Sequence, residues 1–328
     1  MTTISAKEVS ELRKATGAGM MDCKEALKES GGDYDGALDF LRKKGQKIAA
    51  KRADRDANEG VVVAQKNDAG DKAILLALSC ETDFVAKNDD FIALANSLGQ
   101  LAMDKLPATK EELLALEFEG VPLAEKLVER TGTTGEKIEV SDYHMVEGKN
   151  ITSYIHSGAK IGVLVVYEDG GKDGADQFFR SIAMHIAAMS PSIMSPSEFD
   201  ADLVAKETDM IQAQIKAEND LNEAENLGKP IKKIPRFVSK LQMTPEVLAE
   251  VENEIKEELK AEGKPEKIWD KIVPGKVERF VADNTLLDQE RCLLSQFFVV
   301  DDTKTVEQAV SDFAPEAKVA VFKRSSVG

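Results

Sequence analysis

The chain has 328 residues, which is enough for two or three compact units. Its formal net charge of −16 argues against a general nucleic-acid-binding protein, which needs clustered lysine and arginine to neutralise phosphates. Three widely spaced cysteines without a CxxC pair argue against a disulfide framework, and no apolar run approaches the length of a membrane span. Because the first residues also lack the apolar segment of a secretion signal, we expect a cytoplasmic protein without membrane contact.

Residues 1–52 predict a small three-helix, UBA-like module, followed by a polar linker at 53–60. The first helix should begin at the capping-box pattern "SAKE" and end at Gly17. Asp22 and Asp33 are suited to cap the second and third helices, and Gly45 is suited to end the third.

The next block, residues 61–142, predicts the first half of a mixed core. The runs "VVVAQ" and "KAILLALSC" are typical of strands joined by a hairpin at "NDAG". A helix should follow, capped by one of the three residues Asn88, Asp89 and Asp90, since Phe91, Ala95, Leu98 and Ala102 repeat at helical spacing. Two further helices are expected near 109–116 and 121–130.

Residues 143–199 and 270–328 predict a second half built on the same plan. Three strand-like runs precede a helix with Phe178, Ile182, Ile186 and Met189 on one face. Aligning Phe91 with Phe178 superimposes strand, connection and helix in both halves, which indicates a degenerate internal repeat. The fold class is therefore predicted to be α+β, with two repeated β-plus-helix subdomains.

Residues 200–269 predict a long, charged helical hairpin inserted in the second half. The segments "AENLGKPIKKI" and "KAEGKPEKI" each end a charged helix with Gly-Lys-Pro, a combination that stops helices. The repeat suggests that a helix-plus-stop unit has been duplicated. A solvated projection without chemistry of its own is the preferred interpretation.

The sequence shows no catalytic apparatus. His144, His156 and His185 have no second ligand at metal-binding spacing, and the face shared with Phe178 and Ile182 predicts that His185 is buried. His156 begins the turn "HSGAK" and should be exposed. The glycine loops "TGAGMM" and "TGTTGEK" lack the phosphate-binding pattern and are typical of turns that end helices. We therefore expect no catalytic residues, no metal and no cofactor.

The unusual features are apolar residues in expected loops: Met20 and Met21, and Phe84 beside Asp83. The two methionines are equally suited to plug the helical core or to contact a partner. For the second pair, the residues alone favour a structural role, in which Phe84 folds under its loop and Asp83 caps the turn.

Four motifs nevertheless carry a strong resemblance to the elongation factor Ts family. They are "ELRKATGAGMMDCKEAL", "ETDFVAKN", "HSGAKIGVLV" and "IAMHIAA", in that order along the chain. The resemblance covers residues 1 to about 200 and returns near "GKPEKIWDKIVPGKVERF" and in the last strands. The resemblance implies a hairpin longer than is usual for the family, and after "VFKRSSVG" we expect no C-terminal helical segment of the kind that some members carry.

The resemblance implies a guanine-nucleotide exchange factor that binds elongation factor Tu bound to GDP and promotes GDP release during translation elongation. It implies that Thr82, Asp83, Phe84 and Val85 enter the GTPase near its Mg²⁺ site. By the same resemblance, Arg13, Met20 and Met21 touch the nucleotide domain. His156 lies toward a more distant domain. A homodimer through the hairpin is left open, and direct nucleic-acid binding is not expected.

Two other interpretations stay open at this point. The chain could be a non-catalytic scaffold or chaperone-like protein that binds a GTPase without changing nucleotide release. It could also be an enzyme whose site assembles from scattered acids with His156 or His185, although nothing in the spacing supports this.

Overall fold

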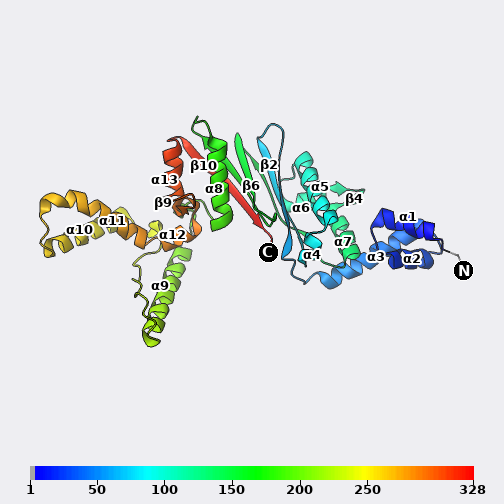
Figure 1. Cartoon of the computed structure of the whole chain (residues 1–328), viewed down its shortest axis with the longest axis horizontal. Helices are drawn as coiled ribbons and strands as arrows, with labels where there is room; N and C mark the ends of the chain where they lie inside the picture. The colour runs from blue at the N-terminus through cyan, green and yellow to red at the C-terminus, as the bar shows by residue number, and fades with distance from the viewer. Residues whose placement is uncertain (1–3) are drawn as a thin grey trace. The chain divides into compact units, whose positions relative to one another are not determined.

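The computed structural model describes residues 4–328 (Figure 1). The chain forms two compact units. The first runs to Ala187 and includes Lys318–Gly328, and the second is Ala188–Ala317. The observed mixture of helices with two three-stranded sheets confirms the predicted α+β class. No helix in the described part of the chain combines the length and apolar character needed to cross a bilayer.

The first unit begins with a helical module of three helices, α1 (Ala6–Thr16), α2 (Met20–Glu29) and α3 (Tyr34–Arg52). The predicted capping box is present, with the Ser5 side chain accepting from the Glu8 backbone, and Gly17 ends α1 in the left-handed conformation. A small aliphatic core fixes the three helices. Its fully buried members are Leu12, Cys23, Ala26, Leu27 and Ala37.

Two boundaries of this module differ from the sequence prediction. Helix α2 begins at Met20 with Gly19 as its N-cap, so Asp22 lies in the first turn and does not cap. Helix α3 continues through Gly45 to Arg52. Gly45 was expected to stop the helix, but it serves instead as a point of close helix contact, because its backbone faces Gly132 of α7 (Leu123–Thr134).

The first half of the core contains the sheet β1-β2-β5. Its strands are β1 (Glu59–Lys66), β2 (Lys72–Cys80) and β5 (Glu139–Glu147), and both pairings are antiparallel. Between β2 and β5 the chain forms four helices and a small ribbon: α4 (Asp83–Ala86), α5 (Asp89–Lys105), α6 (Lys110–Ala115), β3 (Glu117–Phe118), β4 (Val121–Pro122) and α7. The helical stripe Phe91, Ala95, Leu98 and Ala102 is buried as predicted, against one face of this sheet.

The second half contains the sheet β10-β7-β6 and helix α8 (Ala175–Met189). Its strands are β6 (Asn150–Ile155), β7 (Ile161–Asp169) and β10 (Ala317–Ser326). Of the predicted face of α8, Ile182 and Ile186 are buried as expected, but Met189 is exposed and Phe179 is fully buried where Phe178 was expected. The reason is the strand beneath: Phe179 stacks on Tyr167, with ring centroids 4.1 Å apart.

The two sheets pack face to face. Their inner faces share one apolar cluster, which includes Val62, Leu75, Ile151, Leu164 and Val166. In each half a long helix follows the central strand, α5 after β2 and α8 after β7, as the internal repeat predicts (Figure 1).

The second unit is mainly helical. Its regular elements are α9 (Ala201–Ala224), α10 (Pro245–Ala261), α11 (Trp269–Asp283), α12 (Leu286–Arg291), β8 (Phe297–Phe298), β9 (Asp301–Thr305) and α13 (Val306–Phe313). Helices α10 and α11 form an antiparallel pair around Val251, Ile255, Leu259 and Val273. Trp269, the single tryptophan of the chain, packs against this cluster, and its ring N–H donates to the carbonyl of Lys264 at 3.1 Å.

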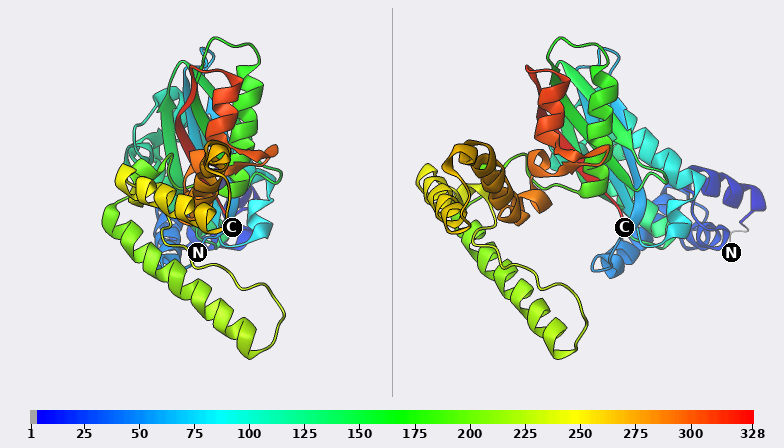
Figure 2. Two further views of the ribbon diagram at one scale, coloured as in Figure 1. Left: turned by 90° about the vertical axis from the view of Figure 1, so that its left-hand side faces the viewer. Right: turned by 60° about the vertical axis from the view of Figure 1, so that its left-hand side comes forward.

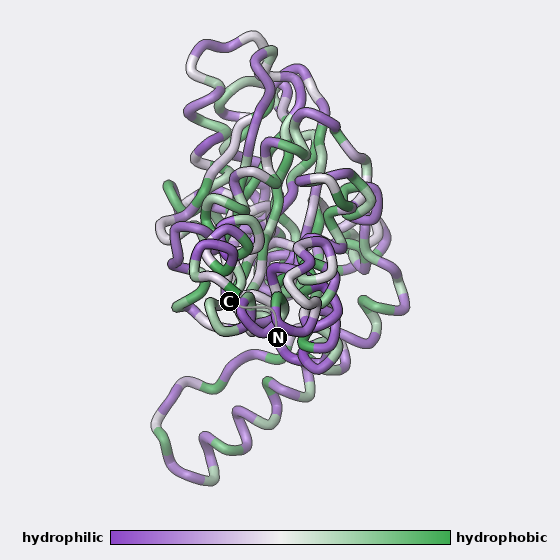
Figure 3. The backbone as a smooth tube through the Cα atoms, turned by 90° about the vertical axis from the view of Figure 1, so that its right-hand side faces the viewer, coloured by the Kyte–Doolittle hydropathy of each residue, from purple (hydrophilic) through white to green (hydrophobic). Residues whose placement is uncertain are grey.

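Helix α9 does not pair with a second long helix. The segment 225–237 returns beside it without helix, as Figure 2 shows, and Asn219 exchanges two hydrogen bonds with Lys232. The second Gly-Lys-Pro segment stops α10 as predicted, with Gly263 at positive φ directly after the C-cap Glu262. Helix α9 instead ends four residues before Gly228, and Asn226 takes the left-handed conformation after its C-cap Glu225. After the end of α9, Pro235 follows Pro230 closely, and residues before proline disfavour the helical conformation. The return segment therefore stays extended, and hydrophilic residues alternate with scattered hydrophobic ones along it (Figure 3).

Candidate functional site

The motif Thr82–Val85 forms the start of α4, a helix of only four residues. Thr82 is the N-cap, and its side chain accepts from the backbone of Val85. Phe84 points outward and is 84% exposed. The expectation that Phe84 folds under a loop is therefore wrong, because the helical turn places Val85 and Ala86 inward and leaves Phe84 on the outer side.

Asp83 was expected to cap the turn, but Thr82 does so. The Asp83 carboxylate instead accepts from the Lys87 ammonium at 2.7 Å, one turn along the chain. This hydrogen bond holds the pKa of Asp83 below its usual value. The carboxylate is thus charged at neutral pH and open to solvent beside Phe84.

The turn after His156 lies near this motif. The backbone N–H of Val62 in β1 donates to the carbonyl of Ala159 at 2.6 Å, which attaches the turn to the first sheet. A cavity of about 530 Å³ is lined by Asp83 and Lys87 together with Lys160. His156 itself is exposed, as predicted, and its Nδ1 lies 2.9 Å from the Tyr154 hydroxyl.

A second patch lies on the helical module. Arg13, Met20 and Met21 line one pocket of about 400 Å³ between α1 and α2. The two methionines are 59% and 73% exposed, so they do not plug the module's core as one interpretation had it. Exposed methionine adapts its shape to a partner surface, which fits a contact role. The residues that line this pocket are all different from those around Asp83 and Lys160.

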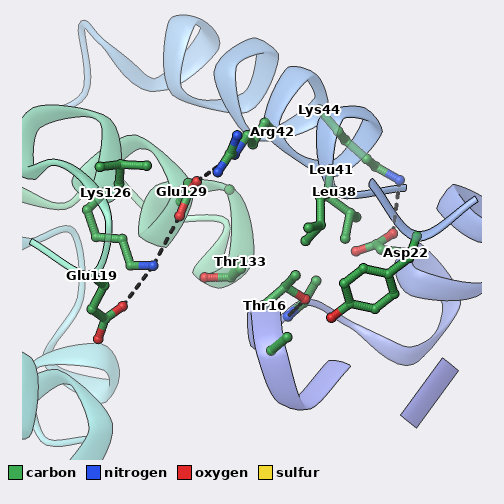
Figure 4. Close-up of a pocket in the computed structure, with 16 residues that line it drawn as sticks. Thr16, Asp22, Leu38, Leu41, Arg42, Lys44, Glu119, Lys126, Glu129 and Thr133 are labelled. Atoms are coloured by element: carbon green, nitrogen blue, oxygen red, sulfur yellow. Dashed lines mark hydrogen bonds and ion pairs between the residues drawn. The ribbon is translucent and has the colours of Figure 1, made fainter. Parts of the chain in front are cut away.

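The helical module is joined to the core through α3 and α7. A Cβ placed on Gly132 would lie 2.5 Å from the Cα of Gly45, so the two helices touch through their backbones. Beside this crossing is a pocket of about 250 Å³, shown in Figure 4. Arg42 of α3 reaches Glu129 of α7 at 3.1 Å, which links the two helices by charge, and Lys126 of α7 reaches the same carboxylate at 3.2 Å.

The histidines do not form a catalytic site. His185 is fully buried, as predicted, and His144 lies 3.1 Å from Asp142. Ser325 also donates to Asp142, at 2.7 Å. In a nucleophilic triad the serine donates to histidine, whereas here both groups contact the carboxylate. The hydrogen bond from His144 is the main cause that lowers the pKa of Asp142 to about 2.

The cysteines and acidic residues give no reactive or metal centre either. Cys80 and Cys292 are buried, and desolvation raises the pKa of each thiol to about 12, so neither is a thiolate nucleophile. Within residues 4–328 no group of three or more candidate ligands is placed to hold a metal ion.

Comparison with known proteins decides the family. The profile described as "Elongation factor TS" matches residues 81–234 and 231–328. The chain belongs to the elongation factor Ts family. It is 67% identical over 327 residues to the elongation factor Ts of Rhodopirellula baltica, with 100% of both chains covered. It is 45% identical to that of Flavobacterium johnsoniae, again over 100% of both chains. For Campylobacter curvus the identity is 44%, covering 98% of this chain and 92% of the relative.

This membership confirms the family indicated by the four sequence motifs. An elongation factor Ts is a factor of translation elongation, so the chain is assigned to protein biosynthesis. Sequence reasoning missed two features of the site. One is Glu136, which bonds to Thr82 and was interpreted only as part of a turn. The other is the Gly45–Gly132 contact, for which two glycines inside helical patterns were the available signal.

Proposed function

We propose that this elongation factor Ts is a guanine-nucleotide exchange factor that binds elongation factor Tu bound to GDP, in the cytoplasm. The observation that carries the proposal is the 84% exposure of Phe84 on a short helix fixed to the core. Burying a phenylalanine side chain stabilises by about 1.5–3 kcal/mol, so an exposed one gains most when a partner covers it. Phe84 is the wedge in this proposal.

The target of the wedge is the Mg²⁺ and phosphate site of the GTPase. Magnesium requires near-ideal octahedral oxygen geometry and bridges the nucleotide phosphates to the protein. Small displacements of the elements around it therefore weaken GDP binding strongly. Thr82 and Val85 fix the turn, while Phe84 supplies the displacement.

Asp83 stabilises the displaced state by accepting hydrogen bonds from groups that the wedge releases. Its present partner is Lys87, and exposed ion pairs of this kind contribute little to stability. The carboxylate can therefore change partners at little cost. No covalent bond is made or broken, so the protein acts without catalytic residues, metal or cofactor of its own.

Two further contacts complete the proposed interface. Arg13, Met20 and Met21 touch the nucleotide domain through the pocket on the helical module. His156 contacts a more distant domain from its exposed turn. A homodimer through residues 200–269 is compatible with this arrangement and is tested by sedimentation at two protein concentrations.

Linkage sets the direction of the cycle. If the factor lowers GDP affinity, GDP lowers the affinity of the factor for the GTPase by the same ratio. A hundredfold ratio corresponds to about 2.7 kcal/mol. The factor should therefore bind nucleotide-free elongation factor Tu most tightly, and rebinding of GTP expels it.

Stopped-flow release of a fluorescent GDP analogue from elongation factor Tu tests the proposal. We expect strong acceleration by the wild-type protein and a large loss with Phe84→Ala. Phe297→Ala is the matched control, since Phe297 is 46% exposed in the second unit, outside the proposed interface. Binding without acceleration would favour the scaffold or chaperone-like alternative. Acceleration that survives Phe84→Ala would keep exchange and remove Phe84 as the wedge.

A further inference from the structure

A carboxylate far along the chain holds the start of α4. Glu136 Oε2 accepts from the backbone N–H of Thr82 at 3.0 Å, and Glu136 Oε1 accepts from the Thr82 hydroxyl at 2.7 Å. The N–H and the hydroxyl of Thr82 therefore both donate to the carboxylate of Glu136, 54 residues away in the sequence. Two hydrogen bonds to one charged group fix orientation as well as distance.

The neighbours of Thr82 and Glu136 form a second contact in the opposite direction, from Lys137 to Glu81. Glu81 Oε1 accepts from the backbone N–H of Lys137 at 2.7 Å. Its other oxygen accepts from Arg52 at the end of α3, also at 2.7 Å. Residues 81–82 and 136–137 thus hold each other through two carboxylates, and we call this set of bonds the double-glutamate clamp.

Glu136 is itself in a defined turn. It follows Gly135, which ends α7 in the left-handed conformation. The Thr134 hydroxyl donates to the carbonyl of Glu136 at 3.2 Å and accepts from its N–H at 3.3 Å. The position of the carboxylate is therefore set by α7, the helix on which the helical module is docked.

Helix α4 needs such support from outside. Four residues are too few for a helix to hold its shape alone. Phe84 contributes almost no burial, and only Val85 and Ala86 face the core. The Cys80 thiol donates to the Thr82 carbonyl at 3.2 Å, whereas the N–H and the hydroxyl of Thr82 both donate to Glu136. The direction of the Phe84 side chain therefore depends on Glu136.

We propose that Glu136 is a positioning residue for nucleotide exchange: by holding Thr82 it fixes the angle at which Phe84 enters the GTPase. This rests on the exchange function proposed above. Glu136 does not touch the partner in this scheme and acts through α4. Its loss should lower the maximal rate of GDP release and leave the concentration of factor at half-maximal rate nearly unchanged.

The test is a double-mutant cycle with Glu136→Gln and Phe84→Ala in the stopped-flow assay. Glutamine keeps the size of the side chain but places a donor where one of the two acceptors stood. We expect a roughly tenfold lower maximal rate, since a displacement of about 1 Å costs up to roughly 10²-fold in an oriented reaction. In the Phe84→Ala background, Glu136→Gln should have no further effect.

The matched control is Glu147→Gln, at the far end of β5 from Glu136. It removes an ion pair with Lys72 at 2.9 Å but touches no part of α4. The pair Thr82→Ser and Thr82→Val gives a second test that leaves Glu136 intact. Serine retains the hydroxyl that bonds to Glu136, so it should keep a higher maximal rate than valine. Thermal melting of each variant checks folding.

The outcomes separate the two proposals. If the wild-type protein does not accelerate GDP release, the exchange function fails. If it does, and Glu136→Gln behaves like Glu147→Gln, the positioning role is overturned. The role is also overturned if Glu136→Gln lowers the rate equally with and without Phe84, because the residue then acts on the fold and not through the wedge. If Glu136→Gln does not fold, equal rates for serine and valine at position 82 overturn it.

Discussion

The two halves of the core share a plan and differ in one connection. In the first half the central strand β2 leads into α5 through α4, a capped helix held by two glutamates, which exposes Phe84. In the second half β7 leads into α8 through the glycine-rich segment 170–174, in which Gly170, Gly171 and Gly174 have positive φ. The two halves thus share the repeated strands and helix as a scaffold. The proposed activity resides in the connection between β2 and α5, which contains a helix that the second half lacks.

The phenylalanines of the two halves give the sharpest test of this contrast. Phe179→Ala in the second half should lower the free energy of unfolding by about 3–5 kcal/mol, because the ring is fully buried on Tyr167. Phe84→Ala should change it by less than about 0.5 kcal/mol, because the ring is exposed. Urea unfolding measures both. A large loss of stability from Phe84→Ala would mean that Phe84 belongs to the fold.

Only the first half carries the helical module. Gly132→Ala should disturb the packing of α3 of this module against α7 of the core. The added Cβ would lie 2.5 Å from the Cα of Gly45, so α3 and α7 must separate. Overpacking of this kind costs about 1–3 kcal/mol. Hydrogen exchange should quicken in residues 34–52 and stay unchanged in β6 and β7. Gly275→Ala, which also lies inside a helix, is the control, since its added Cβ meets no atom within 4 Å and its φ is not positive. Equal effects on residues 34–52 would exclude the close contact as the cause.

The last and smallest loss of stability is expected at Asp142, whose carboxylate connects the two halves of the core by a hydrogen bond. It lies in β5 and accepts from Ser325 in β10. Its pKa is lowered from 3.8 to about 2, so the stabilisation is present above pH 4 and is lost as the pH falls toward 2. Because its side chain is 38% exposed, we expect only about 1 kcal/mol at pH 7.

The measurement is urea unfolding of the wild-type protein and of Asp142→Asn at several pH values. The difference between them should be constant above pH 5 and shrink between pH 4 and pH 2. Asp68→Asn is the control, because Asp68 is exposed in the turn between β1 and β2. A difference that stays constant down to pH 2 would show that the carboxylate charge contributes nothing to stability.

Local signals predicted much of the fold. The capping box at Ser5, the left-handed Gly17 and the helical stripe from Phe91 all report short-range physics and were correct. Gly45 was misjudged because a glycine that stops a helix and one that admits a neighbouring helix look alike in sequence. The return segment after α9 was missed because Asn219 and Asn222 bond to it across a loop, and such pairing leaves no periodic pattern.

The site was less accessible to such reasoning. Residue physics favoured a buried Phe84, and only the family resemblance indicated an exposed one. Thr82 and Glu136 lie far apart in the sequence, and nothing in either segment shows that they meet. Long-range polar contacts of this kind depend on the folded backbone, so no spacing rule reveals them.

The lone Trp269 has a practical consequence for spectroscopy. It lies on the α10–α11 pair in the second unit, and the first unit contains no tryptophan. Intrinsic fluorescence excited at the indole band therefore reports on one unit alone, while circular dichroism averages over both. Coincident transitions from the two signals would mean that the units melt cooperatively, whereas an earlier fluorescence change would show the α10–α11 pair opening first.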